Sequence, residues 1–411
     1  MKTRAGSFPG FLCTVGLLVP RVASHSHISA AIGQCSLNLP AALQSQAQLG
    51  CPHLVDEKTT DRPVEWSPWT HPPECVHSIK SPGASYCVYS NSQHGNGGVS
   101  IITRPETAAS TLEILNDSGY THLKHFVNNS AGPAYKVADI PGKGKGVVAT
   151  RHIKRAEAIM ADWAALVVDM DLPTSLLRTE GYKLFHRAVD QLADPDRVLQ
   201  LARSSAFSGD IVEDILRTNS FSYTLADYSH MTLYPDVSRV NHACRPNSFI
   251  RFTPSSLAVS VVALRDIEPG EEITITYVPL GKAKEERKTA LKKWGFECTC
   301  SLCTASKTEI AVSDYRREKI KELRKEVMNA VGLWDGTRAV KLTHEVLELM
   351  KAEDLAPLYS SQYEIMARLY WKAGDKTTAT KYAQMSLDTL VDQGYLEDTP
   401  DALPILLQTF D

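Results

Sequence analysis

Three short runs, in a fixed order, constrain the fold of this chain more than any other feature. The first is the polar run 241–247, Asn-His-Ala-Cys-Arg-Pro-Asn. The second begins at residue 270 with Gly-Glu-Glu-Ile and ends at Tyr277. The third, 298–303, places three cysteines within six residues. Each run alone is a modest indication, but their order and spacing form a specific combination.

Length and composition set the broad class of protein. A chain of 411 residues is too long for one typical core, so about two or three domains are expected. Hydrophobic residues make up 43% and charged residues 22%, as in ordinary globular proteins. The formal net charge of −3 argues against direct nucleic-acid binding and favours a protein or peptide partner. We expect no membrane span, because no apolar run approaches the roughly 20 residues that one requires.

The first 24 residues are typical of a secretory signal peptide. Lys2 and Arg4 supply positive charge, residues 11–19 form a short apolar core, and residues 22–24 are small. A disordered tail is the alternative. If the chain is secreted, cysteines in the loop-rich region 25–132 become candidates for disulfides, although the sequence leaves their pairing open. These candidates are Cys35, Cys51, Cys75 and Cys87.

The pattern from 133 to 304 is mainly β, with one helical insertion. The expected strands are 135–140, 147–149, 159–168, 249–252, 257–264 and 273–277. From about 172 to 217, apolar residues recur at spacings of three and four, which predicts helices. The region 305–411 reads as helical, with glycines at 374 and 394 as helix stops. Residues 367–383 are typical of one tetratricopeptide-type hairpin, although one copy is not an array.

Together with two further runs, Gly142–Gly146 and Asn219–Phe221, these features resemble the signature of the SET domain, the protein-lysine methyltransferase fold. The resemblance covers roughly residues 133–304. It is closest to the SET-and-MYND subfamily and to fungal relatives that lack the MYND finger. That cysteine-rich zinc finger cannot form here, because the helical insertion contains no cysteine. It implies an α+β protein: a mainly-β SET domain with a helical insert and a post-SET zinc site, then a C-terminal α-helical domain. The C-terminal domain would either form one side of a substrate cleft or be a helical packing domain with no binding role.

The same resemblance implies a function and assigns roles to residues. The reaction would be S-adenosylmethionine-dependent methylation of lysine side chains on a protein substrate. Tyr277 would be the catalytic residue, and Phe296 would stack on the adenine of the cofactor. The other cofactor contacts would be Lys143, Gly144, Lys145, Gly146, Asn219, Asn241 and His242. Considered alone, Asn241 would be a turn former and His242 a core histidine.

The cysteine run favours a metal. Zinc prefers four ligands and favours thiolates, and Cys298, Cys300 and Cys303 supply three. By the resemblance, the fourth ligand is Cys244. Disulfide pairing in an oxidising compartment is the alternative. The chain departs from the family pattern at Ala243, where serine is usual, and at Arg245, which adds a charge to this loop.

Two rival functions and the cellular compartment stay open. One rival is a catalytically silent SET module that binds proteins, and the other is a secreted, disulfide-bonded binding protein. The signal-like segment suggests the secretory pathway, whereas the resemblance suggests nucleus or cytoplasm. A monomer is expected.

Overall fold

The structure is a computed structural model that describes residues 66–112, 115, 132–204, 209–252, 256–393 and 400–410. All of these belong to one compact unit that begins at Asn38. The signal-like segment 1–24, the disulfide candidates Cys35 and Cys51, and Gly394 lie outside the described residues. No helix in the described ranges is long and apolar enough to cross a membrane.

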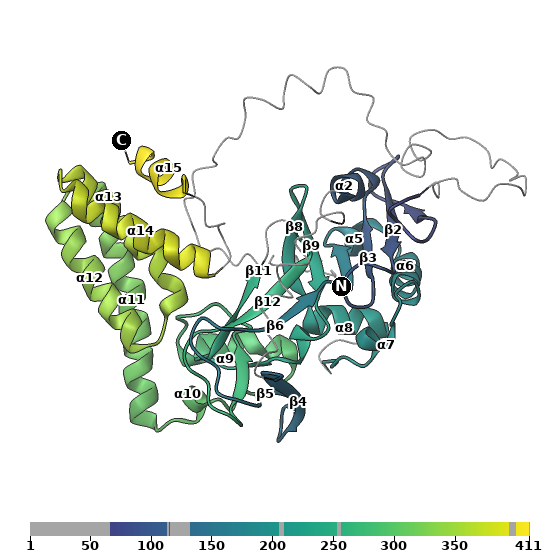
Figure 1. Cartoon of the computed structure of the whole chain (residues 1–411), viewed down its shortest axis with the longest axis horizontal. Helices are drawn as coiled ribbons and strands as arrows, with labels where there is room; N and C mark the ends of the chain where they lie inside the picture. The colour runs from purple at the N-terminus through teal and green to yellow at the C-terminus, as the bar shows by residue number, and fades with distance from the viewer. Residues whose placement is uncertain are drawn as a thin grey trace, which may run out of the picture. The chain divides into compact units, whose positions relative to one another are not determined.

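The largest sheet has six strands in the order β1-β2-β3-β7-β9-β8. Figure 1 labels four of them, β2, β3, β8 and β9. Its strands are β1 (Glu74–His77), β2 (Ser85–Asn91), β3 (Val99–Thr103), β7 (Leu166–Asp169), β8 (Phe221–Leu225) and β9 (Tyr228–Leu233). Neighbouring strands are antiparallel except β3 and β7, which are parallel. The short helix α2 (Pro105–Ser110) follows β3. The described part of the region 25–132 therefore contributes three strands to a sheet that later residues complete.

One pair of the candidate cysteines forms a disulfide in this sheet. Cys75 on β1 and Cys87 on β2 are register partners and are bonded to each other. Cys87 is fully buried and belongs to the main hydrophobic core. The disulfide therefore fastens the edge strand β1 to the strand beside it.

Two smaller sheets lie next in the chain, in the orders β10-β13-β5-β4 and β11-β12-β6. The first contains β4 (Tyr135–Ile140), β5 (Gly144–Ala149), β10 (Asn241–His242) and β13 (Glu272–Ile275). The second contains β6 (Ala158–Trp163), β11 (Ser248–Phe252) and β12 (Ala258–Ala263). The 3-10 helix η2 (Val237–Arg239) precedes β10, which pairs with β13 in parallel. Strands thus form in all six segments where the sequence predicts them.

The segment 159–168, expected to be strand throughout, is in fact divided between two sheets. The amide of Ala164 donates to the carbonyl of Leu257 at 2.8 Å, while the amide of Ala165 donates to that of Leu233 at 2.9 Å. Because successive amides bond to different neighbours, the chain passes from one sheet to the other at this point. An uninterrupted apolar run does not reveal such a change.

The insertion 172–217 is helical in its described part, as predicted. Its helices are α5 (Leu172–Ser175), α6 (Arg178–Asp190), α7 (Asp196–Leu199) and α8 (Ile211–Asn219). The apolar face of α6, which includes Leu184 and Phe185, packs on the six-stranded sheet (Figure 1). Helix α8 begins after Asp210, whose carboxylate accepts hydrogen bonds from the amides of Val212 and Glu213. This cap fixes the start of the helix that carries Asn219 at its end.

The remainder of the described chain is helical. Its elements are α9 (Lys284–Leu291), η3 (Lys292–Trp294), α10 (Ser301–Thr304), α11 (Lys307–Gly332), α12 (Gly336–Ala352), η4 (Ala356–Leu358), α13 (Tyr359–Lys372), α14 (Lys376–Asp392) and α15 (Ala402–Gln408). From α11 to α14, each helix packs on the next (Figure 1). Helix α13 ends just before Gly374, which has a φ of 86° and confirms the predicted stop.

A buried ion cluster joins these helices to the loop after β10. Glu353, next to the end of α12, is 0% exposed. It accepts hydrogen bonds from Ser313 Oγ at 2.6 Å and from Arg317 Nε at 2.9 Å. Arg245, in the loop after β10, lies 3.6 Å from the same carboxylate. The charge that Arg245 adds to this loop is therefore paired by the C-terminal helices.

Candidate functional site

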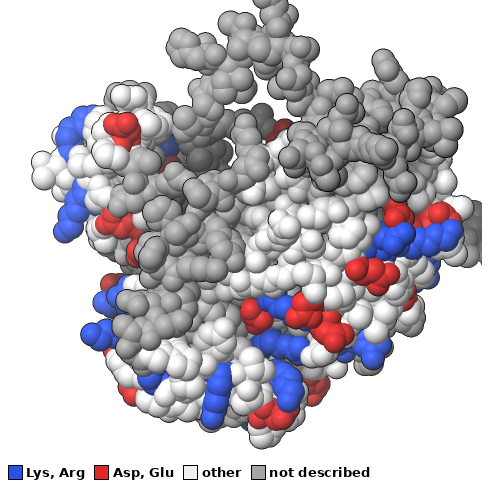
Figure 2. Space-filling view, turned by 45° about the vertical axis from the view of Figure 1, so that its right-hand side comes forward, with Lys and Arg blue, Asp and Glu red and all other residues white. Residues whose placement is uncertain are grey.

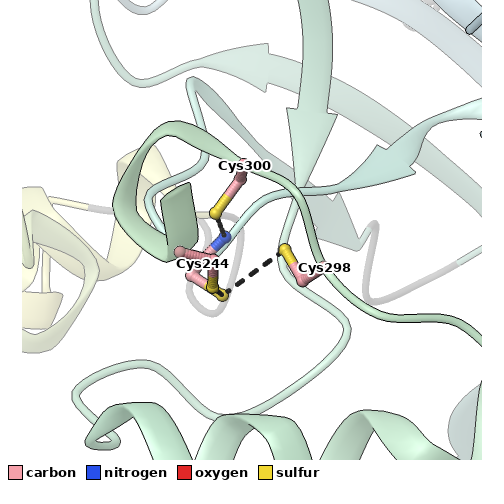
Figure 3. Close-up of side chains that lie close together, drawn as sticks. Cys244, Cys298 and Cys300 are labelled. Atoms are coloured by element: carbon pink, nitrogen blue, oxygen red, sulfur yellow. Dashed lines mark hydrogen bonds between the residues drawn. The ribbon is translucent and has the colours of Figure 1, made fainter. Parts of the chain in front are cut away.

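The four predicted cysteine ligands come together in space. Cys244 follows β10, and the other three lie on the segment from η3 to α10. Figure 3 shows Cys244, Cys298 and Cys300 close together. All four sulfurs lie within 4.8 Å of one another. Cys244 Sγ is 3.8 Å from Cys298 Sγ and 3.5 Å from Cys303 Sγ. Zinc–sulfur bonds of about 2.3 Å in a tetrahedron separate the sulfurs by about 3.8 Å, so the cluster fits this ion.

The surroundings of the cluster also suit a metal. The four thiols are free, in contrast to the Cys75–Cys87 pair, and Cys244 and Cys300 are buried. The amide of Cys244 donates to Cys300 Sγ at 3.5 Å (Figure 3). Hydrogen bonds among the four thiols lower the pKa of Cys300 and Cys303 and raise the pKa of Cys244 and Cys298. Thiolates are the form that binds a metal.

Asn241 connects three segments that are far apart in the sequence. Its side-chain amide donates to the carbonyl of Lys145 at 3.2 Å and to Glu272 Oε1 at 3.0 Å. Gly146 lies directly beneath this contact, because a Cβ there would be 2.7 Å from Asn241 Nδ2 and 2.5 Å from Ile140. Glycine is thus needed at 146 for Asn241 to reach the start of β5.

The side chains of the glycine-rich run Gly142–Gly146 point in different directions. Lys143 faces the site, since its Nζ lies 2.6 Å from Glu272 Oε2. Lys145 pairs at 2.8 Å with the exposed Asp139 on the neighbouring strand, so only its backbone meets Asn241. Gly144 has a φ of 70° and open space around its Cα, which leaves its backbone open to a ligand.

His242 is a buried, neutral imidazole with a defined tautomer. Burial lowers its pKa to about 4. Its Nδ1 accepts a hydrogen bond from the backbone amide of Tyr277 at 3.0 Å, so the single ring proton belongs on Nε2. Nε2 lies 3.3 Å from Cys244 Sγ. One ring therefore contacts both the cysteine cluster and the predicted catalytic residue.

Tyr277 lies just after β13 rather than within it. Its hydroxyl donates to the carbonyl of Val240 at 2.8 Å. Burial, with a further contribution from the charge of Glu272, raises the pKa of Tyr277 well above its ordinary value. The phenol is therefore protonated at neutral pH. Because its proton is held by Val240, the oxygen keeps its lone pairs for a further partner.

Aromatic rings surround Tyr277. The ring of Trp294 is centred 5.4 Å away, that of His242 also 5.4 Å, and that of Phe296 6.4 Å in an edge-on arrangement. Phe296 is 38% exposed, so an aromatic surface faces solvent here. Trp294 Nε1 donates to the carbonyl of Thr218 at 3.0 Å, which joins this group to the end of α8.

Asn219, the last residue of α8, uses its side chain within the protein. Its Nδ2 donates to the carbonyls of Ala202 and Ile215, both at 2.8 Å. Both amide hydrogens are thereby engaged, so only Oδ1 could meet a ligand. The structure thus brings Asn219 to the edge of the site, where it also shapes the end of the helix.

Sequence reasoning missed three residues of this site: Glu272, Val240 and Trp294. Glu272 was visible only as part of the run 270–273, and Val240 acts through its carbonyl, which carries no sequence signature. Trp294 could have been found, because it lies two positions before Phe296 and four positions before Cys298, where the cysteine run begins.

Comparison with known proteins agrees with this geometry. Residues 144–278 match the family model described as "SET domain". The chain is 33% identical over 193 residues to "Histone-lysine N-methyltransferase set5" of Schizosaccharomyces pombe, covering 45% of this chain and 56% of that protein. It is 26% identical over 178 residues to "N-lysine methyltransferase SMYD2-A" of Danio rerio, covering 40% of each.

A third match covers fewer residues at a higher sequence identity. The chain is 41% identical over 88 residues to "Histone-lysine N-methyltransferase SMYD3" of Homo sapiens, covering 21% of this chain and 20% of that protein. The chain thus spans about half the length of the first of these relatives and less of the others. The family match encloses residues 144–146, the Asn241–His242 pair and Tyr277, so this chain carries a SET domain and is similar to the lysine methyltransferases of the set5 and SMYD groups.

Proposed function

We propose that this chain is an S-adenosylmethionine-dependent protein-lysine methyltransferase. The observation that carries the proposal is the placement of Tyr277. Its amide is bonded to His242, its hydroxyl to Val240, and aromatic rings enclose its own ring. The names of the relatives support the same reaction class.

The site has features that suit the cofactor. S-adenosylmethionine, when bound, supplies an electrophilic methyl group on a sulfonium. The start of β5 at residues 144–146, the Asn241–His242 pair and the exposed ring of Phe296 would hold it. Asn241 already contacts the start of β5, and Gly144 leaves backbone open, so a polar ligand could be held here.

The chain's own residues would act on the substrate amine. A free lysine has a pKa near 10.4, so neutralising it at pH 7 costs about 4.6 kcal/mol. The rings of Tyr277 and Trp294 would exclude water and thereby disfavour the ammonium form. The Tyr277 oxygen, with its proton held by Val240, would accept a hydrogen bond from the amine and orient its lone pair. The amine proton would leave to solvent, because no dedicated base is required.

We further propose that Cys244, Cys298, Cys300 and Cys303 hold one zinc ion in a structural role. Four thiolates complete a tetrahedral shell and leave no open position for catalysis. The ion would fix the segment carrying Phe296 against the loop carrying His242. Zinc would thereby stabilise the cofactor pocket without entering the reaction.

A protein or peptide substrate suits the surface and the C-terminal helices. Figure 2 shows Lys and Arg interspersed with Asp and Glu on the visible face, in contrast to a continuous basic surface. The turns before α12 and α14 are alike: Trp334 and Gly374 have positive φ, and Asp335 and Asp375 then cap the helix. This repeated turn supports a tetratricopeptide-like arrangement of the C-terminal helices.

The test uses purified full-length chain with labelled S-adenosylmethionine and an array of lysine peptides. Transfer of label to a lysine is expected, and Asn241→Ala should remove both transfer and cofactor binding in calorimetry. A folded, zinc-loaded chain that binds no cofactor would refute the proposal. Cofactor binding without transfer to any protein would indicate a silent SET module.

A further inference from the structure

We propose that Asp162 is a positioning residue for methyl transfer, because it anchors the short helix η2, whose end holds the hydroxyl of Tyr277. This inference rests on the proposed function, since it concerns the same tyrosine. Asp162 lies on β6, outside the runs that resemble the SET signature. It acts through backbone groups that a sequence pattern does not show.

The carboxylate of Asp162 binds the start of η2. It is 0% exposed, and its Oδ2 accepts hydrogen bonds from the amides of Asp236 at 2.6 Å and Val237 at 3.0 Å. The first amides of a helix have no partner within the helix, so a carboxylate from another element can satisfy them. Burial, with the charge of Asp236, raises the pKa of Asp162 to about 7, whereas the two amides act in the opposite direction. The ionised carboxylate and the start of η2 therefore depend on each other.

Arg197 joins the helical insertion to this contact. It lies on α7, and its Nη2 donates to Asp162 Oδ1 at 3.4 Å and to Asp236 Oδ2 at 3.0 Å. One guanidinium thus pairs with two carboxylates that would otherwise repel each other. Gly97 lies close by, since a Cβ there would be 3.3 Å from Arg197 Nη1. The anchor of η2 is therefore shared by β6, the insertion and the loop before β3.

The other end of η2 carries the contact with Tyr277. The amide of Val240 donates to the carbonyl of Val237 at 2.9 Å, and the carbonyl of Val240 accepts from the Tyr277 hydroxyl at 2.8 Å. Both valines are buried. Val237 is thus bound by Asp162 at its amide and by Val240 at its carbonyl. These bonds form a continuous path from the carboxylate to the oxygen that orients the phenol.

The experiment is a double-mutant cycle on methyl transfer by the full-length chain, with labelled S-adenosylmethionine and a saturating lysine peptide. Asp162→Asn keeps the shape of the side chain but removes its charge, and we expect kcat to fall about 10- to 100-fold. In Tyr277→Phe no hydroxyl is left to position, so adding Asp162→Asn should lower kcat less than about threefold. Equal losses in both backgrounds would overturn the inference, because they would indicate a general structural defect. So would a kcat of Asp162→Asn within about twofold of wild type.

Asp169→Asn is the matched control. Asp169, on β7, is also a buried carboxylate, accepts from the amide of Asp171 at 2.8 Å and lies 3.7 Å from Arg104. Its substitution should also lower stability, but kcat should stay within about twofold of wild type. If Asp162→Asn does not fold, Arg197→Gln takes its place in the cycle, because Arg197 is partly exposed. The same pattern is expected there, with a smaller loss.

Hydrogen exchange followed by mass spectrometry gives a readout that is independent of activity. Asp162→Asn should speed exchange in peptides that cover residues 236–242, and Asp169→Asn should not. Unchanged exchange in this segment would overturn the inference. Wild-type chain that transfers no methyl group would refute the proposed function, and the exchange rates would still decide whether Asp162 anchors η2.

Discussion

Replacing Glu353 by Gln should strongly destabilise the protein, although the substitution is nearly isosteric. Glu353 is fully buried, and Arg317, which is 1% exposed, lies 2.9 Å from it. Arg316 and Arg245 lie 3.4 Å and 3.6 Å from the same carboxylate. Removing its charge leaves Arg317 buried without a counterion. Breaking a buried pair in this way costs about 3–5 kcal/mol, which lowers the folded-to-unfolded ratio at least about 100-fold.

The assay is urea unfolding of the zinc-loaded chain, followed by circular dichroism. The midpoint gives the change in stability, and an unchanged m value shows that the unfolded state is unaltered. Glu326→Gln is the control, because Glu326 pairs with Arg338 at 3.2 Å on the exposed surface of α11 and α12. That pair should contribute less than about 1 kcal/mol.

A double variant sharpens the test. Adding Arg317→Met to Glu353→Gln removes the orphaned charge, so part of the lost stability should return. The reasoning fails if the free energy of unfolding of Glu353→Gln lies within about 1 kcal/mol of that of wild type. It also fails if adding Arg317→Met lowers the free energy of unfolding further, by as much as an independent substitution would.

Three further results are expected. Tyr277→Phe should slow methyl transfer at least about tenfold while cofactor affinity stays unchanged. The lost hydrogen bond to Val240 should lower the free energy of unfolding by about 0.5–1.5 kcal/mol. Unaltered turnover would exclude a role for the hydroxyl. Cys300→Ser should reduce bound zinc, measured by elemental analysis, from about one equivalent to near zero; full retention would contradict the four-thiolate site. Burial lowers the pKa of Lys293 to about 8, so its amine becomes neutral as pH rises through 8. Acylation followed by mass spectrometry should therefore label Lys293 before the exposed Lys288, and equal rates at pH 8 would contradict this.

The sequence alone allowed the cysteine cluster to be predicted. Three cysteines within six residues indicate a metal site by their spacing alone, whereas the family resemblance supplied Cys244 as the fourth ligand. The same holds for the helical insertion and the β segments, whose periodicities differ. The placements of Asn241, His242 and Tyr277 also follow from their runs. Their assigned roles remain predictions.

The sequence could not reveal partners that depend on how the elements pack. Glu353 stands far along the chain from Arg245, and no local pattern links them. Arg287 looks like an ordinary charge on an exposed helix, yet its side chain is only 2% exposed. The division of 159–168 between two sheets likewise depends on which carbonyls lie beside Ala164 and Ala165.

His242 shows why the three runs of the sequence act as one unit. The run 241–247 supplies the ring, the run ending at Tyr277 supplies the amide bound to Nδ1, and Nε2 is directed at Cys244, beside the cysteines of the third run. A neutral ring has one proton, so accepting from Tyr277 obliges it to donate toward the sulfur. Charging the ring would break the bond to Tyr277, and burial opposes this by lowering the pKa of His242 to about 4. The position of Tyr277 is therefore coupled to the sulfur cluster through a group that stays neutral across the physiological pH range.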